Sequence, residues 1–166
     1  MENLAIVTAR MSSRRLPGKV MRKIQNIPTI KILYDRLKKS NLIDRIAIST
    51  TNCKSDDVLV DFLKKKKKRF YRGSKKNVVE RVIKTANLFK AKNIILITGD
   101  CPLIDFNLVD QCIRTFKSNK VDFVTNANIR SFPDGMDVQV FKKSSLVKFY
   151  RKTKIIKEFE HVTLNM

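Results

Sequence analysis

The chain has 166 residues, of which 43% are hydrophobic and 31% charged, and its formal net charge is +21. This length suits one well-buried domain and is short for two. No apolar run is long enough to span a membrane and no secretory signal opens the chain, so we expect a cytoplasmic protein. Three cysteines without a C-x-x-C pair and a single histidine argue against a disulfide framework and against a structural zinc site.

The excess positive charge raises the question of a nucleic-acid partner. Lysine outnumbers arginine and is scattered among many Ile and Asn residues, as a genome-wide compositional bias would produce. The lysine run at 64–68 falls where a helix is expected to end, and cations there complement the helix dipole. We therefore favour a solvated helix end over an anion-binding patch. A specific nucleic-acid-binding protein is the less favoured alternative, because no zinc finger and no basic motif interleaved with aromatic residues is present.

The first predicted strand, Leu4-Ala5-Ile6-Val7, leads into a basic loop at 9–19. This loop combines three arginines, a lysine, two serines and a Pro-Gly turn. Open α/β sheets bind ligands in loops at the carboxyl ends of parallel strands. Guanidinium, ammonium and backbone N–H donors there suit a polyphosphate. Composition alone leaves a plain basic surface loop as an equal alternative.

Strand and helix patterns then alternate. Pro28 is expected to start a helix, Ser55-Asp56-Asp57 supplies capping chemistry for the next one, and apolar residues on both faces at 94–97 predict a central parallel strand. The segment 126–133 is expected to be a loop, and 137–141 an edge or antiparallel strand. Further strands are expected at 46–48, 70–71 and 121–124, and a helix at about 144–152. The fold class is α/β, a single domain at 1–166 built as a three-layer α/β/α sandwich with a mainly parallel sheet.

The central strand is followed by Thr98-Gly99-Asp100, which should meet the basic loop at the same edge of the sheet. An aspartate facing a cationic loop suits a Mg²⁺-dependent phosphoryl or nucleotidyl transfer. Gly99 would let the backbone approach closely. The alternative role for Asp100 is a cap on the following helix. No G-x-x-x-x-G-K-[ST] or G-x-G-x-x-G sequence is present, so neither a P-loop nor a standard dinucleotide fingerprint is expected.

Five motifs occur along the chain in one order: 9–19, Arg72-Gly73-Ser74, Thr98 to Asp105, Pro133-Asp134-Gly135-Met136-Asp137-Val138, and Glu160-His161-Val162-Thr163. Together they resemble the cytidylyltransferase family that includes the spore coat polysaccharide biosynthesis protein SpsF, related to the CMP-sialate (acylneuraminate) and CMP-Kdo synthetases. The resemblance implies a Rossmann-like nucleotide-diphospho-sugar transferase fold of the GT-A type.

The resemblance also implies a function: transfer of CMP from CTP to a sugar or sugar-acid acceptor, with release of pyrophosphate, for surface polysaccharide biosynthesis. Mg²⁺ would be held by Asp100, and a homodimer is one implied assembly. Catalysis is assigned to Arg10, Lys19 and Asp100, and acceptor binding to Asp134 and Asp137. Nucleotide binding is assigned to Ala9, Arg10, Met11, Ser12, Ser13, Arg15, Lys19, Thr50, Gly73, Ser74, Arg81, Thr98 and Gly99, including backbone donors from Ala9 to Ser13.

The sequence departs from the family pattern in two ways. Arg14 stands where the family usually has a small polar residue. The chain also lacks the V-D-x-P-E-D-like stretch that supplies a second metal carboxylate in relatives, so we expect a C-terminally truncated member of the family. An inactive or partner-dependent nucleotide-binding homologue is therefore the second hypothesis. A catalytic base at His161 is a minority interpretation, and the residues do not identify the acceptor.

Overall fold

A computed structural model describes residues 2–13, 15–129, 131–152 and 162. The order of elements is β1 (Asn3–Thr8), η1 (Lys19–Met21), β2 (Lys23–Ile24), β3 (Ile27–Pro28), α1 (Thr29–Leu37), β4 (Arg45–Thr51), η2 (Lys54–Asp56), α2 (Asp57–Lys65), β5 (Phe70–Gly73), α3 (Val78–Leu88), β6 (Asn93–Thr98), α4 (Phe106–Ser118), β7 (Phe123–Thr125), β8 (Gln139–Lys142) and α5 (Lys143–Lys152). Arg14 and the Glu160, His161 and Thr163 positions of the last motif lie outside the described residues.

The sheet has six strands in the order β5-β4-β1-β6-β8-β7. Strands β5, β4, β1 and β6 run parallel, whereas β8 is antiparallel to both of its neighbours. The predicted strand at 137–141 is thus antiparallel, as one alternative had it, but it lies between β6 and β7 and not at an edge. A small β2–β3 hairpin was not predicted from the sequence. Its two-residue turn, Gln25-Asn26, has positive φ at both positions.

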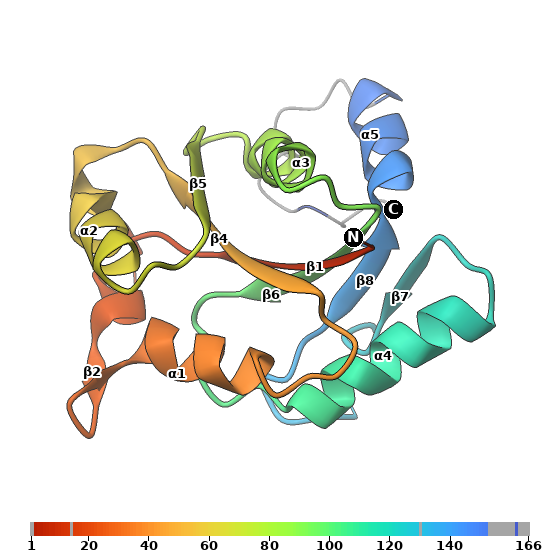
Figure 1. Cartoon of the computed structure of the whole chain (residues 1–166), viewed down its shortest axis with the longest axis horizontal. Coiled ribbons are helices and arrows are strands. Elements are labelled where there is room, and N and C mark those ends of the chain that lie inside the picture. The colour runs from red at the N-terminus through yellow and green to blue at the C-terminus, as the bar shows by residue number, and fades with distance from the viewer. Residues whose placement is uncertain (1, 14, 130, 153–161, 163–166) are drawn as a thin grey trace.

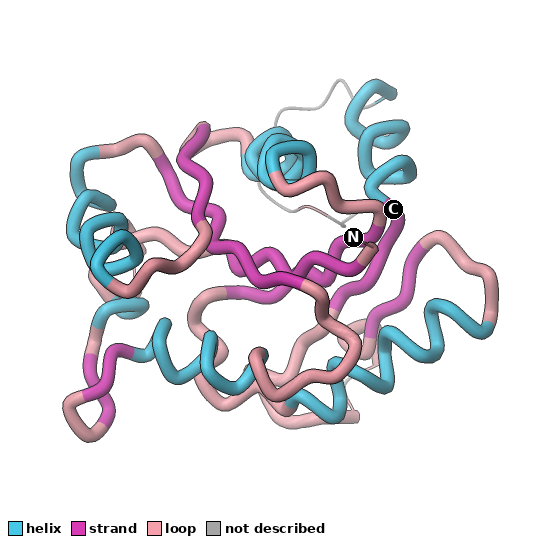
Figure 2. The backbone as a smooth tube through the Cα atoms, in the orientation of Figure 1, coloured by secondary structure: helices cyan, strands magenta, loops and turns pink. Residues whose placement is uncertain are grey.

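Helices cover both faces of the sheet, so the predicted three-layer α/β/α architecture is confirmed (Figures 1 and 2). Alternate residues of β1 explain the layering. Ala5 and Val7 face the core shared with α1, α2 and α4, whereas Leu4 and Ile6 face the core shared with α3 and α5. Both sets are fully buried, as a central parallel strand requires. The strand ends β1, β4 and β6 are therefore held rigidly beside one another.

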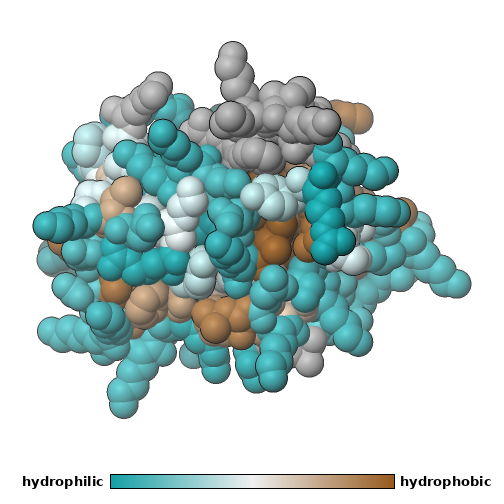
Figure 3. All heavy atoms as spheres, turned by 90° about the horizontal axis from the view of Figure 1, so that it is seen from above, coloured by the Kyte–Doolittle hydropathy of each residue, from teal (hydrophilic) through white to brown (hydrophobic). Residues whose placement is uncertain are grey.

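The surface is dominated by charged and polar side chains. Figure 3, seen from the side of α3 and α5, shows hydrophilic residues over most of the described part of that face. Helix α2 ends at Lys65, and the lysines at 64–67 are exposed around its end, as the helix-end interpretation predicts. Lys68 lies 3.9 Å from the centroid of the Tyr34 ring. Within the described ranges, no helix has the length and apolar character needed to cross a bilayer.

Candidate active site

The basic loop that follows β1 is closed by its own backbone. Gly18 N donates to the carbonyl oxygen of Met11 at 2.8 Å, and Gly18 has a φ of 69°. Glycine adopts this left-handed conformation without the steric penalty of a side chain. The turn then leads directly into η1, whose first residue is Lys19 and whose Val20 is buried in the core. The loop therefore has a fixed base from which its cations project.

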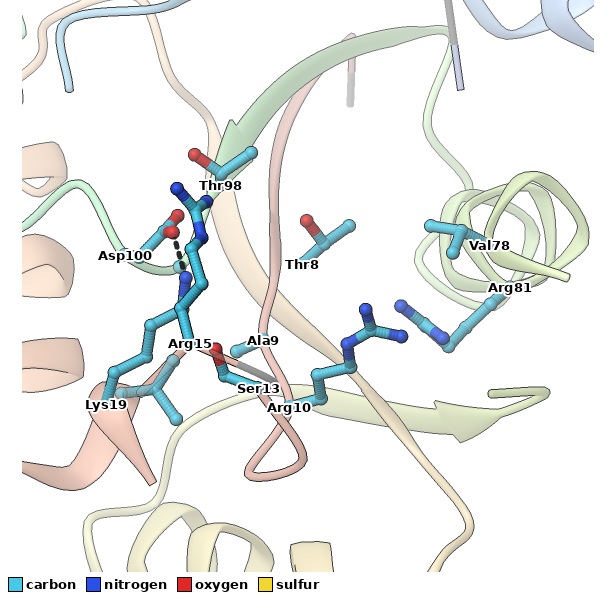
Figure 4. Close-up of a pocket in the computed structure, with 12 residues that line it drawn as sticks. Thr8, Ala9, Arg10, Ser13, Arg15, Lys19, Val78, Arg81, Thr98 and Asp100 are labelled. Carbon is cyan, nitrogen blue, oxygen red and sulfur yellow. Dashed lines mark hydrogen bonds and ion pairs between the residues drawn. The ribbon is translucent and has the colours of Figure 1, made fainter. Parts of the chain in front are cut away.

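The loops after β1 and β6 meet in a pocket of about 470 Å³, as the sequence predicts (Figure 4). Arg15, Lys19 and Asp100 lie on one side of this pocket, whereas Arg10 and Arg81 lie on the other, with their guanidinium groups turned toward each other. The lining residues are Thr8, Ala9, Arg10, Ser13, Arg15, Lys19, Val20, Val78, Arg81, Thr98, Gly99 and Asp100. Four of these side chains are cationic and one is a carboxylate, so the pocket suits an anionic ligand.

Close backbone contact between β1 and β6 depends on Gly99. Its N–H donates to the carbonyl oxygen of Thr8 at 2.8 Å. A Cβ atom at position 99 would lie 2.8 Å from that oxygen and 2.9 Å from the Cβ of Ala9. The expectation that Gly99 permits a close approach is therefore confirmed. Because Asp100 is the next residue, this contact also sets the depth at which its carboxylate enters the pocket.

Asp100 forms an ion pair with Lys19 across the pocket. Burial favours the neutral carboxyl, but the hydrogen bond and charge of Lys19 outweigh it, so the pKa of Asp100 is lowered. Asp100 is therefore ionised at neutral pH. It does not cap α4, because the Asp105 side chain caps that helix by accepting from Asn107 N at 2.8 Å.

Arg81 projects from α3 into the other side of the pocket and is 3% exposed. One of its guanidinium nitrogens donates to the carbonyl oxygen of Ser74 at 2.6 Å. Its Nε atom is buried and has no hydrogen-bond partner among the described residues. Burial and the nearby charge of Arg10 lower the pKa of Arg81 to about 10. A buried donor left open beside a second cation is an arrangement that an anion or a carbonyl oxygen would stabilise.

Several predicted site residues lie behind the pocket wall. The Thr50 hydroxyl is buried and donates to Asp56 at 3.1 Å. Gly73 packs against the side chain of Arg81, and Ser74 accepts the hydrogen bond from Arg81. The turn at 73–74 thus supports Arg81. The predicted residues that do not line the pocket are Met11, Ser12, Thr50, Gly73, Ser74, Asp134 and Asp137.

The role of the backbone N–H groups from Ala9 to Ser13 in nucleotide binding stays a prediction, but the structure limits how many of them can serve. Three of these amides are already hydrogen-bonded within the protein. Ala9 N donates to Ser49 O at 3.1 Å, Met11 N to Asp56 Oδ1 at 2.7 Å, and Ser13 N to Met11 O at 2.9 Å. These bonds shape the loop, so in this structure the pocket depends mainly on the arginine and lysine side chains.

Asp56 is the main residue whose role sequence reasoning missed. It was interpreted as helix-capping chemistry, but it makes no capping hydrogen bond on α2. The carboxylate is fully buried and binds the basic loop instead. Local sequence could not show this, because an aspartate before an apolar helix has the ordinary pattern of a cap. Thr8, Val20 and Val78 also line the pocket without having been predicted.

The two aspartates of the 133–138 motif are exposed. Asn126 fixes this loop beside the end of β7, because its side chain donates to Met136 O at 2.9 Å and accepts from Val138 N at 2.8 Å. Burial raises the pKa of the Cys101 thiol, and the charges of Asp100 and Asp137 add to that rise. The charge of Asp137 therefore acts on the thiol of Cys101, the residue that follows Asp100.

Asp100 provides the oxygen donor that a magnesium site requires. Within the described part of the chain, no three His, Cys, Asp or Glu side chains form a metal-binding group. Magnesium is commonly held by one or two carboxylates together with substrate phosphates and water. One carboxylate opposite a cationic loop fits that pattern. It fits a structural zinc site poorly, since zinc takes four protein ligands there.

A mainly parallel sheet with an anion pocket and an aspartate at the carboxyl ends of its strands is the arrangement in which α/β proteins bind nucleotides. The cytidylyltransferase family model matches residues 4–164. The chain therefore belongs to the cytidylyltransferase family, a family of CTP-dependent nucleotidyltransferases, and the resemblance predicted from its motifs is confirmed.

Individual relatives agree with this assignment. The chain is 32% identical to the spore coat polysaccharide biosynthesis protein SpsF of Bacillus subtilis, over 97% of this chain and 68% of that protein. It is 33% identical to an uncharacterized protein of Methanocaldococcus jannaschii, over 98% of this chain and 66% of that protein. A cytidylyltransferase structure from Leptospira borgpetersenii has a TM-score of 0.93 at 31% identity, covering 99% of this chain and 70% of that one. The chain thus spans about two thirds of the length of these relatives.

Proposed function

We propose that this chain binds CTP with Mg²⁺ in the pocket between the loops after β1 and β6 and transfers CMP to a sugar or sugar-acid acceptor. The observation that carries the proposal is the pocket between these loops, whose lining includes Arg10, Lys19 and Arg81 together with Asp100. Polyphosphates are recognised by guanidinium groups that grip two oxygens and by ammonium point charges. The family assignment supplies the nucleotide, since the matching model describes a cytidylyltransferase.

In this proposal the residues act by position and charge. Arg10, Arg15 and Lys19 hold the triphosphate, and Arg81 adds a fourth positive charge at the wall of the pocket. An acceptor hydroxyl oxygen attacks the α-phosphorus and gives up its proton to water, the bond from that phosphorus to the bridging oxygen breaks, and pyrophosphate leaves with the bond's electron pair. Alignment and charge stabilisation supply most of the catalysis in such transfers. Mg²⁺ held by Asp100 would neutralise charge that accumulates on the phosphate oxygens.

The acceptor is assigned to the exposed carboxylates of Asp134 and Asp137, which accept hydrogen bonds from sugar hydroxyls. Asp137 is close enough to the pocket for its charge to raise the pKa of the thiol of Cys101, the residue after Asp100. The similarity to the spore coat polysaccharide biosynthesis protein SpsF of Bacillus subtilis motivates a role in surface polysaccharide biosynthesis. A cytoplasmic location and a homodimer complete the proposal.

The first test is isothermal titration of the purified chain with CTP, ATP and UTP, each with and without Mg²⁺. We expect binding that requires Mg²⁺ and favours CTP. Equal affinity for all three nucleotides, or no binding, would contradict the proposal. Release of pyrophosphate from CTP in the presence of a panel of sugars and sugar acids then separates an enzyme from a nucleotide-binding homologue without turnover.

A further inference from the structure

Asp56 is a fully buried carboxylate with no salt bridge to any described lysine or arginine. Burying a charge is costly unless hydrogen bonds satisfy it. Its Oδ2 atom accepts from the Thr50 hydroxyl at 3.1 Å, from the Thr51 backbone N–H at 3.1 Å and from the Thr51 hydroxyl. These three donors fix the carboxylate against the end of β4.

The other oxygen of Asp56 reaches across to the basic loop. Its Oδ1 atom accepts from the backbone N–H of Met11 at 2.7 Å, a contact between residues 45 positions apart in the chain. Met11 is also the residue whose carbonyl oxygen accepts from Gly18 N and Ser13 N. The peptide groups of Met11 therefore join Asp56 to the turn that closes the loop.

This chain of hydrogen bonds connects Asp56 to both cationic sides of the pocket. Arg10 directly precedes Met11, and Lys19 directly follows Gly18. A displacement of the Met11 amide would therefore move both side chains. Asp56 itself does not line the pocket, so it cannot act by touching a ligand there.

We propose that Asp56 is a positioning residue that fixes the basic loop, through the Met11 amide, in the conformation that receives the nucleotide triphosphate. This inference rests on the proposed function of the pocket. It assigns a specific task to a carboxylate whose local sequence indicates only a helix cap. A preformed loop binds more tightly because the ordering cost has been met during folding.

Asp56→Asn tests the link, because the amide can replace only one carboxylate oxygen. Its carbonyl oxygen is expected to face the three donors from Thr50 and Thr51. The NH₂ group would then face the Met11 N–H, which is also a donor, so that hydrogen bond is lost. We expect the affinity for CTP with Mg²⁺ and the affinity for inorganic tripolyphosphate to fall by the same factor, about 10- to 100-fold.

Asp110→Asn is a matched control. Asp110 is 4% exposed, and it also accepts from a hydroxyl, that of Ser40, and from a backbone amide, Asn41 N at 3.0 Å. It fixes the turn before β4, which lies at the amino-terminal ends of the parallel strands, whereas the pocket lies at their carboxyl ends. We expect a similar loss in the free energy of unfolding for both variants, but unchanged CTP and tripolyphosphate affinity for Asp110→Asn. Equal affinities for Asp56→Asn and the wild type would overturn the inference.

A second measurement uses the wild-type chain and does not depend on the variant folding. Amide hydrogen exchange should show Met11 N–H strongly protected without ligand and little more protected with tripolyphosphate. Protection of Met11 that arises only on ligand binding would show that Asp56 does not preform the loop. If the wild type binds neither CTP nor tripolyphosphate, the proposed function itself fails and the inference fails with it. If the wild type binds both ligands and Asp56→Asn binds them as tightly as Asp110→Asn does, the proposed function stands and only the inference about Asp56 is wrong.

Discussion

Replacing Gly99 with alanine would disturb the close backbone contact between the loops after β1 and β6 at the candidate active site. The added Cβ would lie 2.8 Å from the Thr8 carbonyl oxygen, 2.9 Å from the Ala9 Cβ and 3.2 Å from the Ala9 Cα. These separations fall about half an ångström short of ordinary van der Waals contact. Two of the three opposing atoms belong to the backbone of a central strand and its loop, so no side-chain rotation relieves the overlap.

The expected loss in the free energy of unfolding is about 1 to 3 kcal/mol, the range for overpacking a well-packed site. Gly99 has no left-handed φ, so alanine adds no conformational strain, and the reduced entropy of the unfolded chain returns about 0.4 to 1 kcal/mol. A net loss remains. The melting temperature of a chain this long should fall by about 2 to 4 °C for each kcal/mol lost. Separation of β1 from β6 by about half an ångström should also weaken CTP binding about tenfold, because it moves Asp100 relative to Lys19.

Urea denaturation and CTP titration of Gly99→Ala measure the two effects, with Gly135→Ala as the control. Gly135 has a φ of 90° and open space around the Cβ position. Alanine at position 135 should lower the free energy of unfolding by about 1 to 3 kcal/mol through backbone strain, without any clash. The affinity for CTP should be unchanged. If Gly99→Ala stays within about 0.5 kcal/mol of wild type, the range of neutral surface substitutions, and binds CTP normally, the reasoning from close packing is refuted.

Three further outcomes are expected. Lys19→Met should raise the pKa of Asp100, whose lowered value depends on that ammonium group, so in carboxyl NMR titrations Asp100 should become protonated at a higher pH; an unchanged titration would rule out the ion pair. A group whose pKa is lowered by folding stabilises the fold at pH values above its unfolded pKa, and this stabilisation is lost as the pH falls through its folded pKa. In the wild type the contribution of Asp100 to the free energy of unfolding should therefore disappear only on acidification. Acid unfolding of the wild type and of Lys19→Met measures this difference. Arg81→Met removes a cation from the pocket wall and should weaken CTP binding at least about tenfold, the scale of a lost interaction with a charged group. It also removes the hydrogen bond to Ser74 O, so the unfolding free energy should fall by about 1 kcal/mol; calorimetry that found normal CTP affinity would exclude Arg81 from the nucleotide site. Asp137→Asn should leave CTP affinity unchanged and raise KM for the sugar acceptor in pyrophosphate-release assays, and the reverse pattern would place Asp137 in the nucleotide site.

Sequence reasoning succeeded where local patterns carry long-range consequences. Continuous apolar runs such as Ile94 to Ile97 predict buried parallel strands because both faces of such strands are covered by helices. Parallel strands bring their carboxyl-end loops to one edge of the sheet. For that reason the meeting of the basic loop with the loop that carries Asp100 was predicted. The ion pair between Lys19 and Asp100, 81 positions apart, is seen only in the structure.

The position of β8 and the roles of Asp56 and Thr50 could not be predicted in this way. Period-two alternation at 137–141 predicts a strand but does not identify its neighbours, so its insertion between β6 and β7 was not predicted. Asp56 has the local pattern of a helix cap, and only the folded chain brings the Met11 amide within 2.7 Å of its carboxylate.

The sequence by itself determined the α/β class, the family and the pair of loops that form the pocket, because hydrophobic periodicity and ordered motifs are local properties of the chain. Only the tertiary structure decided which groups face the ligand and which hold those groups in place. The roles of Asp56 and Arg81 depend on the groups that pack around them, and these groups are not their neighbours along the chain. Burial and partners, which determine the energy of a polar group, are created only when distant segments pack together.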